Sequence, residues 1–301
     1  MAGLAFVSII VPVYNNEKII GDCIEALLGQ DYPKDRYEVI IIDNNSTDKS
    51  AEIIKSYPVQ YALEDTIQTS YAARNRGVKS SRGEILAFLD ADCIAEKDWL
   101  KKGAGGFAED NIGCVTGEVK STKPQNYVEE YLCKKDVFSQ KSSLNNFFLP
   151  RVVTANTFYR RDVFNKIGFF RERWVSGGDA DFGWRMQLET AYKVKFISDA
   201  VVFHKHRSTL ESMFKQSVKW GIGSVLLYKK YKGKIPPRRL KETLWIIQRL
   251  FYIAAKSLIF FFSNKEKMEP KKRGRYLDLV SFMGWEIGRV IGSIKNRVFY
   301  I

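Results

Sequence analysis

Two short acidic motifs stand out, because paired carboxylates can bind a metal ion or accept a proton. Asp90 and Asp92 lie in the stretch LDADC, and Asp179 and Asp181 lie in GGDADFGWR. Carboxylate oxygens suit hard divalent cations such as Mg²⁺ and Mn²⁺, which also bind phosphate oxygens. A single carboxylate beside a bound hydroxyl group can instead act as a general base. The ordinary alternative for either motif is a solvated pair at the start of a helix.

The elements that would position these motifs alternate between apolar runs and segments with helical periodicity. Strands are expected at 7–14, 37–43 and 84–92, and helices at 17–30, 46–57 and 70–81. This order predicts an α/β fold with a mostly parallel sheet and helices on both faces. In such sheets, ligands bind beyond the carboxyl ends of the strands. Pro12–Tyr14, Asp43–Asn45 and Asp90–Asp92 each end an expected strand, so we expect them to meet in one crevice.

Two charged residues near this crevice have more than one possible role. Asp43 could accept hydrogen bonds from a nucleobase or ribose, or it could cap the helix expected near Ser46. Arg74, in the stretch AARNRG, could neutralise a phosphate or tie the sheet to its acidic residues. The sequence leaves both alternatives open.

The charge of the 301-residue chain is distributed unevenly. The net charge is +14, and residues 205–301 contain 22 Lys and Arg against 6 Asp and Glu. This asymmetry favours an anionic partner for the last third, either a membrane surface or a nucleic acid. The four cysteines show no metal-binding spacing and are expected to be reduced thiols. The N-terminal apolar run lacks a basic leader and a cleavage site, so we interpret it as a buried strand.

The sequence pattern of the last third predicts helices. We expect the chain to divide into a domain at 1–220 and a helical segment at 221–301. The stretch 244–262 is long and apolar, but Arg249 and Lys256 favour an amphipathic helix in the membrane interface over a span. A helical hairpin packed on the main domain is the alternative. Small residues at 284, 288 and 292 would let another helix approach closely, within one chain or in a homo-oligomer.

The combination of motifs resembles family 2 glycosyltransferases, which have the GT-A fold. The segments that carry the resemblance, over about residues 6–220, are VSIIVPVYNNE, IIDNNSTD, AARNRG, LDAD, GGDADFGWR and FHKHRS. The resemblance implies an inverting transfer of a sugar from a nucleotide-diphosphate sugar to a hydroxyl acceptor, with Mn²⁺ or Mg²⁺ as cofactor. The stretch QSVKW resembles the Gln-x-x-Arg-Trp element of membrane-associated members, with Lys219 in place of Arg.

The resemblance also assigns roles on the donor side of the reaction. Pro12, Tyr14 and Asp43 match the positions that cradle the nucleoside. Asp90 and Asp92 match the motif that holds the metal ion and the ribose-diphosphate. The metal and the diphosphate form one site, and proton removal from the acceptor requires a second, on the opposite face of the reacting carbon.

For that second site, the resemblance implies Asp179 as the catalytic base. Gly178 departs from the family pattern, which usually has Glu at this position. The resemblance further implies that His204 completes the metal shell, with His206 as an alternative. Asn156 matches a segment that contacts the donor sugar, and Trp220 matches a residue that lines the acceptor site. Asp181 has an ordinary alternative as an ion-pair partner of Arg185 on the following helix.

The basic tail places the protein, as an expectation, on the cytoplasmic side of the cell membrane as a peripheral enzyme. A lipid-linked or membrane-proximal acceptor in surface polysaccharide or glycolipid synthesis would fit that location. Two rival functions are a nucleic-acid-binding protein and a nucleotidylyltransferase. No zinc finger or RNA-recognition signature supports the first, so no nucleic acid is expected. The Gly-rich, Lys-containing loop of the second is absent after the first strand, as is the G-x-G-x-x-G of a Rossmann oxidoreductase.

Overall fold

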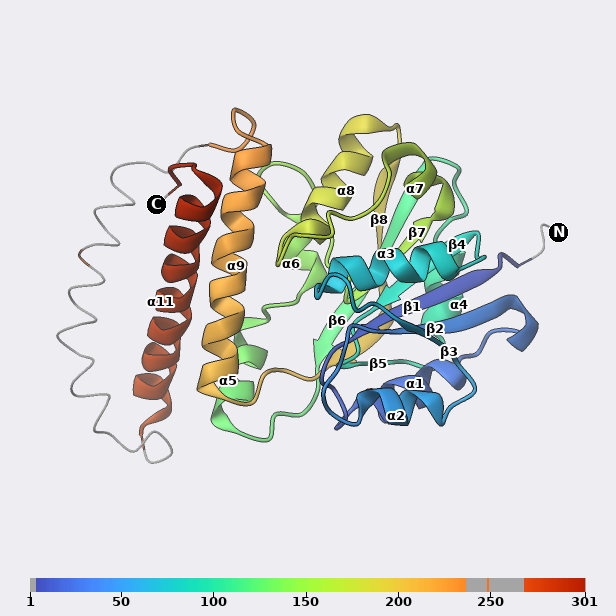
Figure 1. The fold of residues 1–301 in the computed structure, drawn as a ribbon, viewed down its shortest axis with the longest axis horizontal. Coiled ribbons are helices and arrows are strands. Elements are labelled where there is room, and N and C mark those ends of the chain that lie inside the picture. Colours follow the sequence, from blue (N-terminus) through green and yellow to red (C-terminus); the bar gives the residue numbers. More distant parts are fainter. Residues whose placement is uncertain (1–3, 237–247, 249–267, 301) are drawn as a thin grey trace. The chain divides into compact units, whose positions relative to one another are not determined.

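The computed structural model describes residues 4–236, 248 and 268–300 (Figure 1). Within these residues one sheet runs in the order β3-β2-β1-β4-β7-β6-β8-β5. Its strands are β1 Val7–Val13, β2 Tyr37–Asp43, β3 Gln60–Leu63, β4 Ile85–Leu89, β5 Cys93–Ala95, β6 Ile112–Ser121, β7 Asn156–Arg160 and β8 Lys193–His204. The helices are α1 Ile20–Leu28, α2 Ser50–Lys55, α3 Ser70–Ser80, α4 Trp99–Gly105, α5 Tyr127–Lys135, α6 Gln140–Leu144, α7 Arg161–Ile167, α8 Gly178–Glu189, α9 Leu210–Lys230 and α11 Pro270–Asn296, with a 3₁₀ turn η1 at Lys34–Arg36.

The expected parallel sheet is confirmed for its first half. Strand β1 pairs in parallel with both β2 and β4, and β2 pairs in parallel with β3. The second half is mixed, because β7 runs antiparallel to β4 and β6, and β5 runs antiparallel to β8. The sequence did not predict β3, a four-residue edge strand whose side chains are exposed or only partly buried. Such a strand lacks the apolar pattern on which a prediction depends.

Helices cover both faces of the sheet, as expected, and β1 shows why its sequence is apolar throughout. Ile9 and Val11 point into a core that includes residues of α1, α2 and α4. The intervening Ile10 points into a second core with residues of α3, α7 and α8. All three side chains are fully buried. A strand buried on both faces is nearly continuously hydrophobic, and it has no polar side for solvent.

The loops after β1 and β2 are tied together, which shortens the helix expected at 46–57. The backbone N–H of Thr47 donates to Asn15 Oδ1 at 2.8 Å, and the N–H of Glu17 donates to Asp48 Oδ2 at 3.0 Å. Polar groups of residues 47 and 48, at the expected start of the helix, therefore join the two loops, and α2 begins only at Ser50. This pairing fixes the two loops that leave the carboxyl ends of adjacent strands.

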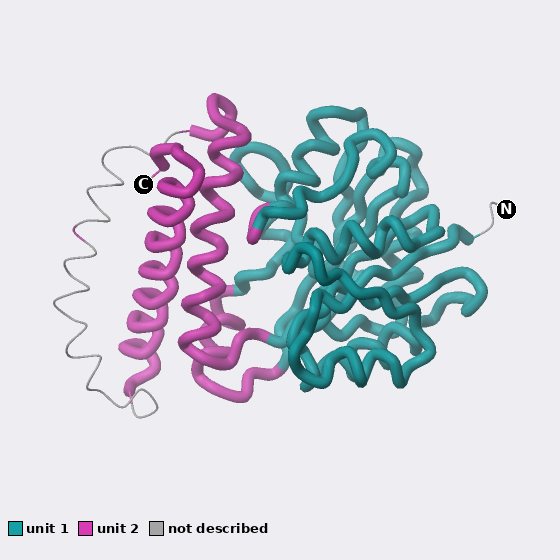
Figure 2. Tube along the Cα trace, viewed as in Figure 1, with its two compact units in different colours: residues 1–122, 136–174, 178–205 teal, residues 123–135, 175–177, 206–301 magenta. Residues whose placement is uncertain are grey.

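The chain divides into two compact units (Figure 2). Unit 1 comprises Met1–Thr122, Asp136–Trp174 and Gly178–Lys205, and contains the whole sheet. Unit 2 comprises Lys123–Lys135, Val175–Gly177 and His206–Ile301. The division expected at residue 220 instead falls inside α9, which is a continuous helix.

In unit 2, α9 packs closely on α11, and the glycines expected to form a contact ladder lie in this interface. A Cβ atom at Gly288 would stand 2.1 Å from the Val218 carbonyl oxygen, and one at Gly221 would stand 2.1 Å from that of Trp285. Gly284 and Gly292 face α9 in the same way. The ladder is thus used within one chain, so it gives no support to the homo-oligomer predicted through it.

None of the helices in the described ranges is long and apolar enough to cross a membrane. Apart from residue 248, the stretch 244–262, predicted to lie in the membrane interface, falls outside the described residues.

Candidate active site

The nucleoside-binding positions predicted from the sequence lie at the ends of β1 and β2. Pro12 pairs with Ile42 across the two strands, and Tyr14 is half exposed just beyond β1. Asp43 ends β2 and is almost fully buried. Its two oxygens accept hydrogen bonds from the Ser46 N–H at 3.0 Å and from the Tyr61 hydroxyl at 3.2 Å.

Asp43 therefore organises the loop after β2, and it is not the cap of a helix, because α2 begins later, at Ser50. Asn15 and Asn45 follow the two strand ends with positive φ angles of 49° and 62°. Asparagine tolerates this left-handed conformation better than most residues. Both loops thus turn sharply at the edge where a ligand would bind, and the nucleoside role of Pro12, Tyr14 and Asp43 stays a prediction.

The first acidic motif forms a turn, and the expectation that it continues the strand is wrong. Strand β4 ends at Leu89, and the Cys93 N–H donates to the Asp90 carbonyl at 3.0 Å, which closes the turn before β5. The Asp90 carboxylate is 28% exposed and pairs with the buried guanidinium of Arg74. Burial and the neighbouring Asp92 raise the pKa of Asp90, while Arg74 and His204 lower it. Of the two roles considered for Arg74, the structure therefore shows the ion pair with an acidic residue.

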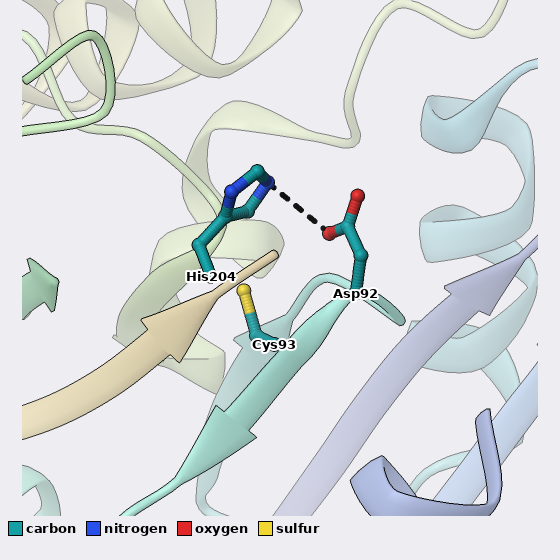
Figure 3. Close-up of side chains that lie close together, drawn as sticks. All are labelled: Asp92, Cys93 and His204. Atoms are coloured by element: carbon teal, nitrogen blue, oxygen red, sulfur yellow. Dashed lines mark ion pairs between the residues drawn. The ribbon is translucent and has the colours of Figure 1, made fainter. Parts of the chain in front are cut away.

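Asp92 and His204 face each other across a two-stranded ladder (Figure 3). Strands β5 and β8 run antiparallel with Cys93 opposite His204, and the Lys205 N–H donates to the Asp92 carbonyl at 2.8 Å. His204 Nε2 lies 3.3 Å from Asp92 Oδ1. Asp92, Cys93 and His204 each offer a ligand atom, and these atoms lie within 4.8 Å of one another. This group does not include His206, the predicted alternative.

The chemistry of this group fits a hard divalent cation held by two of the three residues. Carboxylate oxygen and imidazole nitrogen suit Mn²⁺, and a carboxylate with added phosphate oxygens suits Mg²⁺. Burial, together with Asp92 and Asp90, raises the pKa of the Cys93 thiol well above its usual value. A protonated thiol is a poor ligand, because metals bind the thiolate. Asp92 and His204 would therefore hold the ion and leave positions open for a diphosphate.

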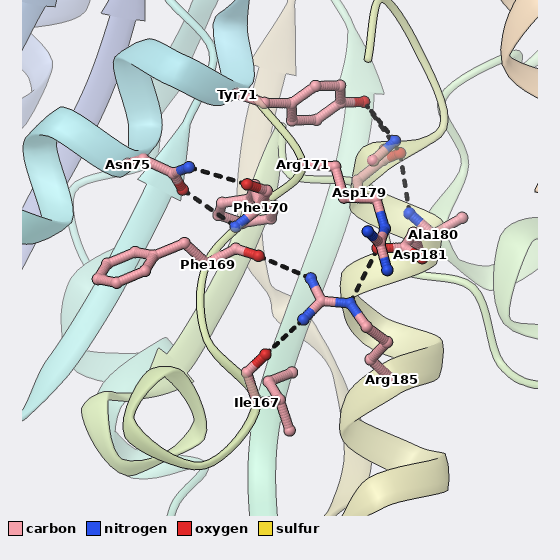
Figure 4. Close-up of polar contacts among 11 residues, drawn as sticks. Tyr71, Asn75, Ile167, Phe169, Phe170, Arg171, Asp179, Ala180, Asp181 and Arg185 are labelled. Atoms are coloured by element: carbon pink, nitrogen blue, oxygen red, sulfur yellow. Dashed lines mark hydrogen bonds and ion pairs between the residues drawn. The ribbon is translucent and has the colours of Figure 1, made fainter. Parts of the chain in front are cut away.

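Asp179 lies in the first turn of α8 and is the one carboxylate of the second motif that reaches the surface (Figure 4). Its Oδ1 atom accepts the Ala180 N–H at 2.9 Å and the Tyr71 hydroxyl at 3.4 Å. No described residue donates a hydrogen bond to Oδ2. The Tyr71 hydroxyl also accepts the Gly178 N–H at 2.9 Å. One carboxylate oxygen is held and the other is available for a proton.

Asp181 is fully buried and forms the predicted ion pair with Arg185, Nε to Oδ2, at 2.9 Å. Arg171 Nε lies 3.1 Å from the same oxygen. The remaining guanidinium nitrogens of Arg185 donate to the carbonyl oxygens of Ile167 and Phe169 (Figure 4). A buried carboxylate surrounded by such partners is structural, because it has no access to a substrate.

The prediction that Asn156 contacts the donor sugar is wrong, because the residue is completely buried at the start of β7. Its amide nitrogen donates to the carbonyl oxygens of Glu118 and Ala200, each at 2.8 Å, and its oxygen accepts the indole N–H of Trp99 at 2.8 Å. These bonds join β7 to β6 and β8. The family resemblance of the segment implied a ligand contact, but the Asn156 side chain forms hydrogen bonds in the interior of the sheet.

Helix α3 connects the two acidic motifs, and this connection was not predicted. Arg74 forms an ion pair with Asp90. Tyr71, one turn earlier in the helix, forms hydrogen bonds with Asp179 and Gly178. The Arg74 guanidinium carbon lies 5.5 Å from the centre of the Tyr71 ring. The only signal in the sequence was the i, i+3 spacing of the two residues, which places them on one face of a helix. Trp220, the predicted acceptor residue, lies on α9 of unit 2 and stays a prediction.

Comparison with known proteins identifies this arrangement. Residues 8–168 match the family described as Glycosyl transferase family 2. Glycosyltransferase AglE of Haloferax volcanii is 34% identical over 253 residues, which cover 81% of each chain. A Methanococcus voltae relative, named dolichyl N-acetyl-alpha-D-glucosaminyl phosphate 3-beta-D-2,3-diacetamido-2,3-dideoxy-beta-D-glucuronosyltransferase, is 24% identical over 75% of this chain and 74% of its own.

Solved structures show the same fold. The mannosyltransferase PcManGT from Pyrobaculum calidifontis, in complex with GDP-Man and Mn²⁺, superposes with a TM-score of 0.64 at 16% identity, over 96% of this chain and 88% of its own. TarS 1–349 of S. aureus in complex with UDP gives a TM-score of 0.52 at 21% identity, over 98% and 93%. The family match covers more than half of the chain, and the fold agrees with it. The protein belongs to the family 2 glycosyltransferases and is a glycosyltransferase with the GT-A fold.

Proposed function

We propose that the protein is an inverting glycosyltransferase that moves a sugar from a nucleotide-diphosphate sugar to a hydroxyl group of a lipid-linked or membrane-proximal acceptor. The observation that carries the proposal is the pairing of two acidic sites through one helix. Arg74 of α3 holds the turn that contains Asp90, and Tyr71 of the same helix holds Asp179. One site suits a metal-bound diphosphate, and the other suits an acceptor proton.

On the donor side, Asp92 and His204 would hold the divalent cation. When bound, the cation stabilises the negative charge that grows on the leaving diphosphate. Arg74 keeps Asp90 in place beside this site. The structural relatives support the assignment, since PcManGT was solved with GDP-Man and Mn²⁺ and a Mycobacterium tuberculosis relative with Mn²⁺ and UDP. Pro12, Tyr14 and Asp43 would receive the nucleoside at the same edge of the sheet.

On the acceptor side, Asp179 would act as the general base. Its Oδ2 atom takes the hydroxyl proton while the acceptor oxygen forms a bond to the anomeric carbon. In the same step the bond from that carbon to the phosphate oxygen breaks, and the electron pair leaves with the nucleoside diphosphate. A single displacement from the opposite face inverts the configuration. The hydrogen bonds to Oδ1 keep the free oxygen in one orientation.

Features of unit 2 support an acceptor at a membrane. Exposed apolar side chains at positions 287, 290 and 294 lie on one face of α11, at intervals of three and four residues. Lys295 and Arg297 follow at the end of this helix. Apolar and cationic groups together favour binding at an anionic lipid surface. The Methanococcus voltae relative carries dolichyl phosphate in its name, which fits an acceptor of this kind in surface polysaccharide or glycolipid synthesis. Trp220 would line the acceptor site, on the cytoplasmic side of the membrane.

A thermal-shift panel tests the donor assignment. The protein is heated with UDP-, GDP- and dTDP-sugars, each with and without Mn²⁺. We expect one nucleotide class to raise Tm in the presence of Mn²⁺ and to lose most of this effect in Asp92→Asn. The product linkage is then read by NMR, and an α-linked donor must give a β-linked product. A product that retains the donor configuration contradicts the inverting mechanism.

Vesicle flotation tests the membrane assignment. The protein is mixed with phosphatidylglycerol or phosphatidylcholine vesicles at low and high salt. We expect flotation with the anionic vesicles, weakened by salt and by Ile287→Asp with Ile294→Asp. Salt-dependent binding to DNA without binding to either vesicle would instead favour the nucleic-acid alternative.

A further inference from the structure

We propose that Tyr71 is a positioning residue for Asp179, which orients the carboxylate for proton transfer from the acceptor. The proposal rests on the assignment of Asp179 as the base. Tyr71 itself touches neither substrate nor metal in this assignment, because it is 5% exposed and buried against the start of α8. Its effect on the reaction passes through the Asp179 side chain.

The Tyr71 hydroxyl is placed to act on both the backbone and the side chain at the start of α8. It accepts the N–H of Gly178 at 2.9 Å and donates to Asp179 Oδ1 at 3.4 Å. The first backbone N–H groups of a helix have no partner inside the helix. One hydroxyl therefore satisfies such a group and fixes the carboxylate that follows it (Figure 4).

The absence of a side chain at residue 178 is part of the same arrangement. A Cβ atom on Gly178 would lie 2.8 Å from two carbon atoms of the Tyr71 ring. The ring occupies the space that any larger residue at 178 would need. The departure of Gly178 from the usual Glu thus has a physical reason, since Tyr71 supplies the polar contact from a neighbouring helix.

The Tyr71 ring is held from several sides, so its hydroxyl has a defined position. Phe170 stacks on the ring with centroids 6.0 Å apart, and the Arg74 guanidinium lies over it at 5.5 Å. The Thr69 side chain caps α3 by accepting the Ala72 N–H at 3.1 Å. A residue that positions another must itself be locked by its surroundings.

The charged and polar groups around Asp179 determine how the loss of the Tyr71 hydroxyl would affect its carboxylate. The Tyr71 hydroxyl is the only side-chain donor that the structure shows on the Asp179 carboxylate within the described residues. Tyr159 interacts with Asp179 electrostatically, and Asp181 carries its charge between Arg171 and Arg185. Burial raises the pKa of Tyr71, which keeps the hydroxyl protonated as a donor. A donated hydrogen bond favours the ionised carboxylate over the protonated acid.

The first test is Tyr71→Phe, which keeps the ring and removes only the hydroxyl. We expect kcat to fall about tenfold, with the donor KM unchanged within about twofold. The matched control is Tyr32→Phe, which removes a buried hydroxyl that donates to the Ala5 carbonyl, far along the chain from both acidic motifs. A Tyr71→Phe enzyme with the wild-type kcat, or one whose donor KM changes as much as its kcat, overturns the proposal.

The second test separates the hydroxyl from the packing of the ring. Gly178→Ala should push against Tyr71 and lower both Tm and kcat. Tyr71→Leu with Gly178→Ala removes the clash with the ring and keeps an apolar side chain in its place, so we expect Tm to recover part of the loss while kcat stays low. Recovery of kcat together with Tm would mean that only packing matters, and the positioning role would be wrong.

Asp179→Asn distinguishes the failure of this proposal from the failure of the proposed function. If Asp179→Asn retains full activity, the base lies elsewhere and both assignments fail. If Asp179→Asn is inactive while Tyr71→Phe is unchanged, the base assignment stands and only the role of Tyr71 is wrong.

Discussion

The segments 90–92 and 179–181 have the same Asp-Ala-Asp sequence but differ in backbone and surroundings. The first is a turn between β4 and β5, and the second is the first turn of α8. In the turn, both carboxylates remain partly accessible and face a cation or an imidazole. At the helix start, only Asp179 reaches the surface, while Asp181 is buried and forms ion pairs with two arginines.

This difference follows from where successive residues point. Positions two apart in a turn can direct two carboxylates toward one side of the backbone, which suits a shared ligand. In an α-helix, residues two apart are about 200° apart around the axis, so one faces out when the other faces in. The same three letters therefore give a ligand-binding pair in one place and one base plus one structural anchor in the other.

The largest expected effect distinguishes the role of Asp179 from that of the turn at 90–92. Asp179→Asn should lower kcat by about a thousandfold, because proton removal by a positioned base contributes roughly 10²–10⁴. The protein should still be stabilised by Mn²⁺ with the donor nucleotide, since the turn is untouched. Steady-state kinetics and thermal shifts on the same preparation check this. Loss of the Mn²⁺ response in this variant would contradict the division of roles.

The second prediction separates the two carboxylates of α8. Asp181→Ala should lower the free energy of unfolding by about 3–5 kcal/mol, because it leaves the buried Arg185 charge without its partner. Urea denaturation measures the change. A surface ion pair serves as control: Lys215→Ala on α9 should change stability by less than about 0.5 kcal/mol, since Lys215 and Glu211 are exposed. Equal effects would show that Asp181 is not an anchor.

The third prediction concerns the turn and its partner strand. Asp92→Asn and His204→Ala should each weaken Mn²⁺ binding at least tenfold, because each removes one ligand of the candidate site. Asp181→Asn is the comparison from the other motif and should leave Mn²⁺ affinity unchanged in the folded protein. Titration of Mn²⁺ followed by electron paramagnetic resonance gives the affinities. Unchanged binding in both variants of the turn would contradict the assignment.

The smallest expected effect is a pH dependence at Arg74. Arg74 lowers the pKa of Asp90 against the opposing effect of burial, so Arg74→Gln should raise that pKa further. Asp90 then becomes protonated at a higher pH, and the donor KM of the variant should rise as the pH falls toward 5. We expect an increase of about threefold relative to wild type at low pH, and a smaller one at pH 8. A KM ratio independent of pH would speak against this effect.

The sequence predicted the parts of the fold that depend on local pattern. The spans of β1 and β2 match their apolar runs closely, and the Asp181–Arg185 pair followed from i, i+4 spacing on a helix. The boundaries of α1 and α2 were predicted too long, because polar residues in the flanking loops bond one another across the two loops. Such contacts between distant segments leave no periodic signal.

The site was predicted only in part for the same reason. Asp92 and His204 were recognised as candidates from residue type and family resemblance, and the structure brings them together. Asn156 was assigned from family resemblance, but burial within the sheet decides its role. Tyr71 was missed, because an aromatic residue in an amphipathic helix looks like an ordinary core residue. Its importance depends on Gly178, more than a hundred positions away.

The ladder between β5 and β8 has a consequence for how the protein gains its metal site. Asp92, which directly precedes β5, and His204 come together only after the intervening chain has folded and β8 has paired with β5 at the edge of the sheet. The two ligands are therefore far apart in the unfolded chain, and the ion binds a folded state that it also stabilises. Cation concentration and folding stability are thus thermodynamically linked. A mutation that loosens this sheet edge should appear first as a higher metal requirement, before any loss of secondary structure.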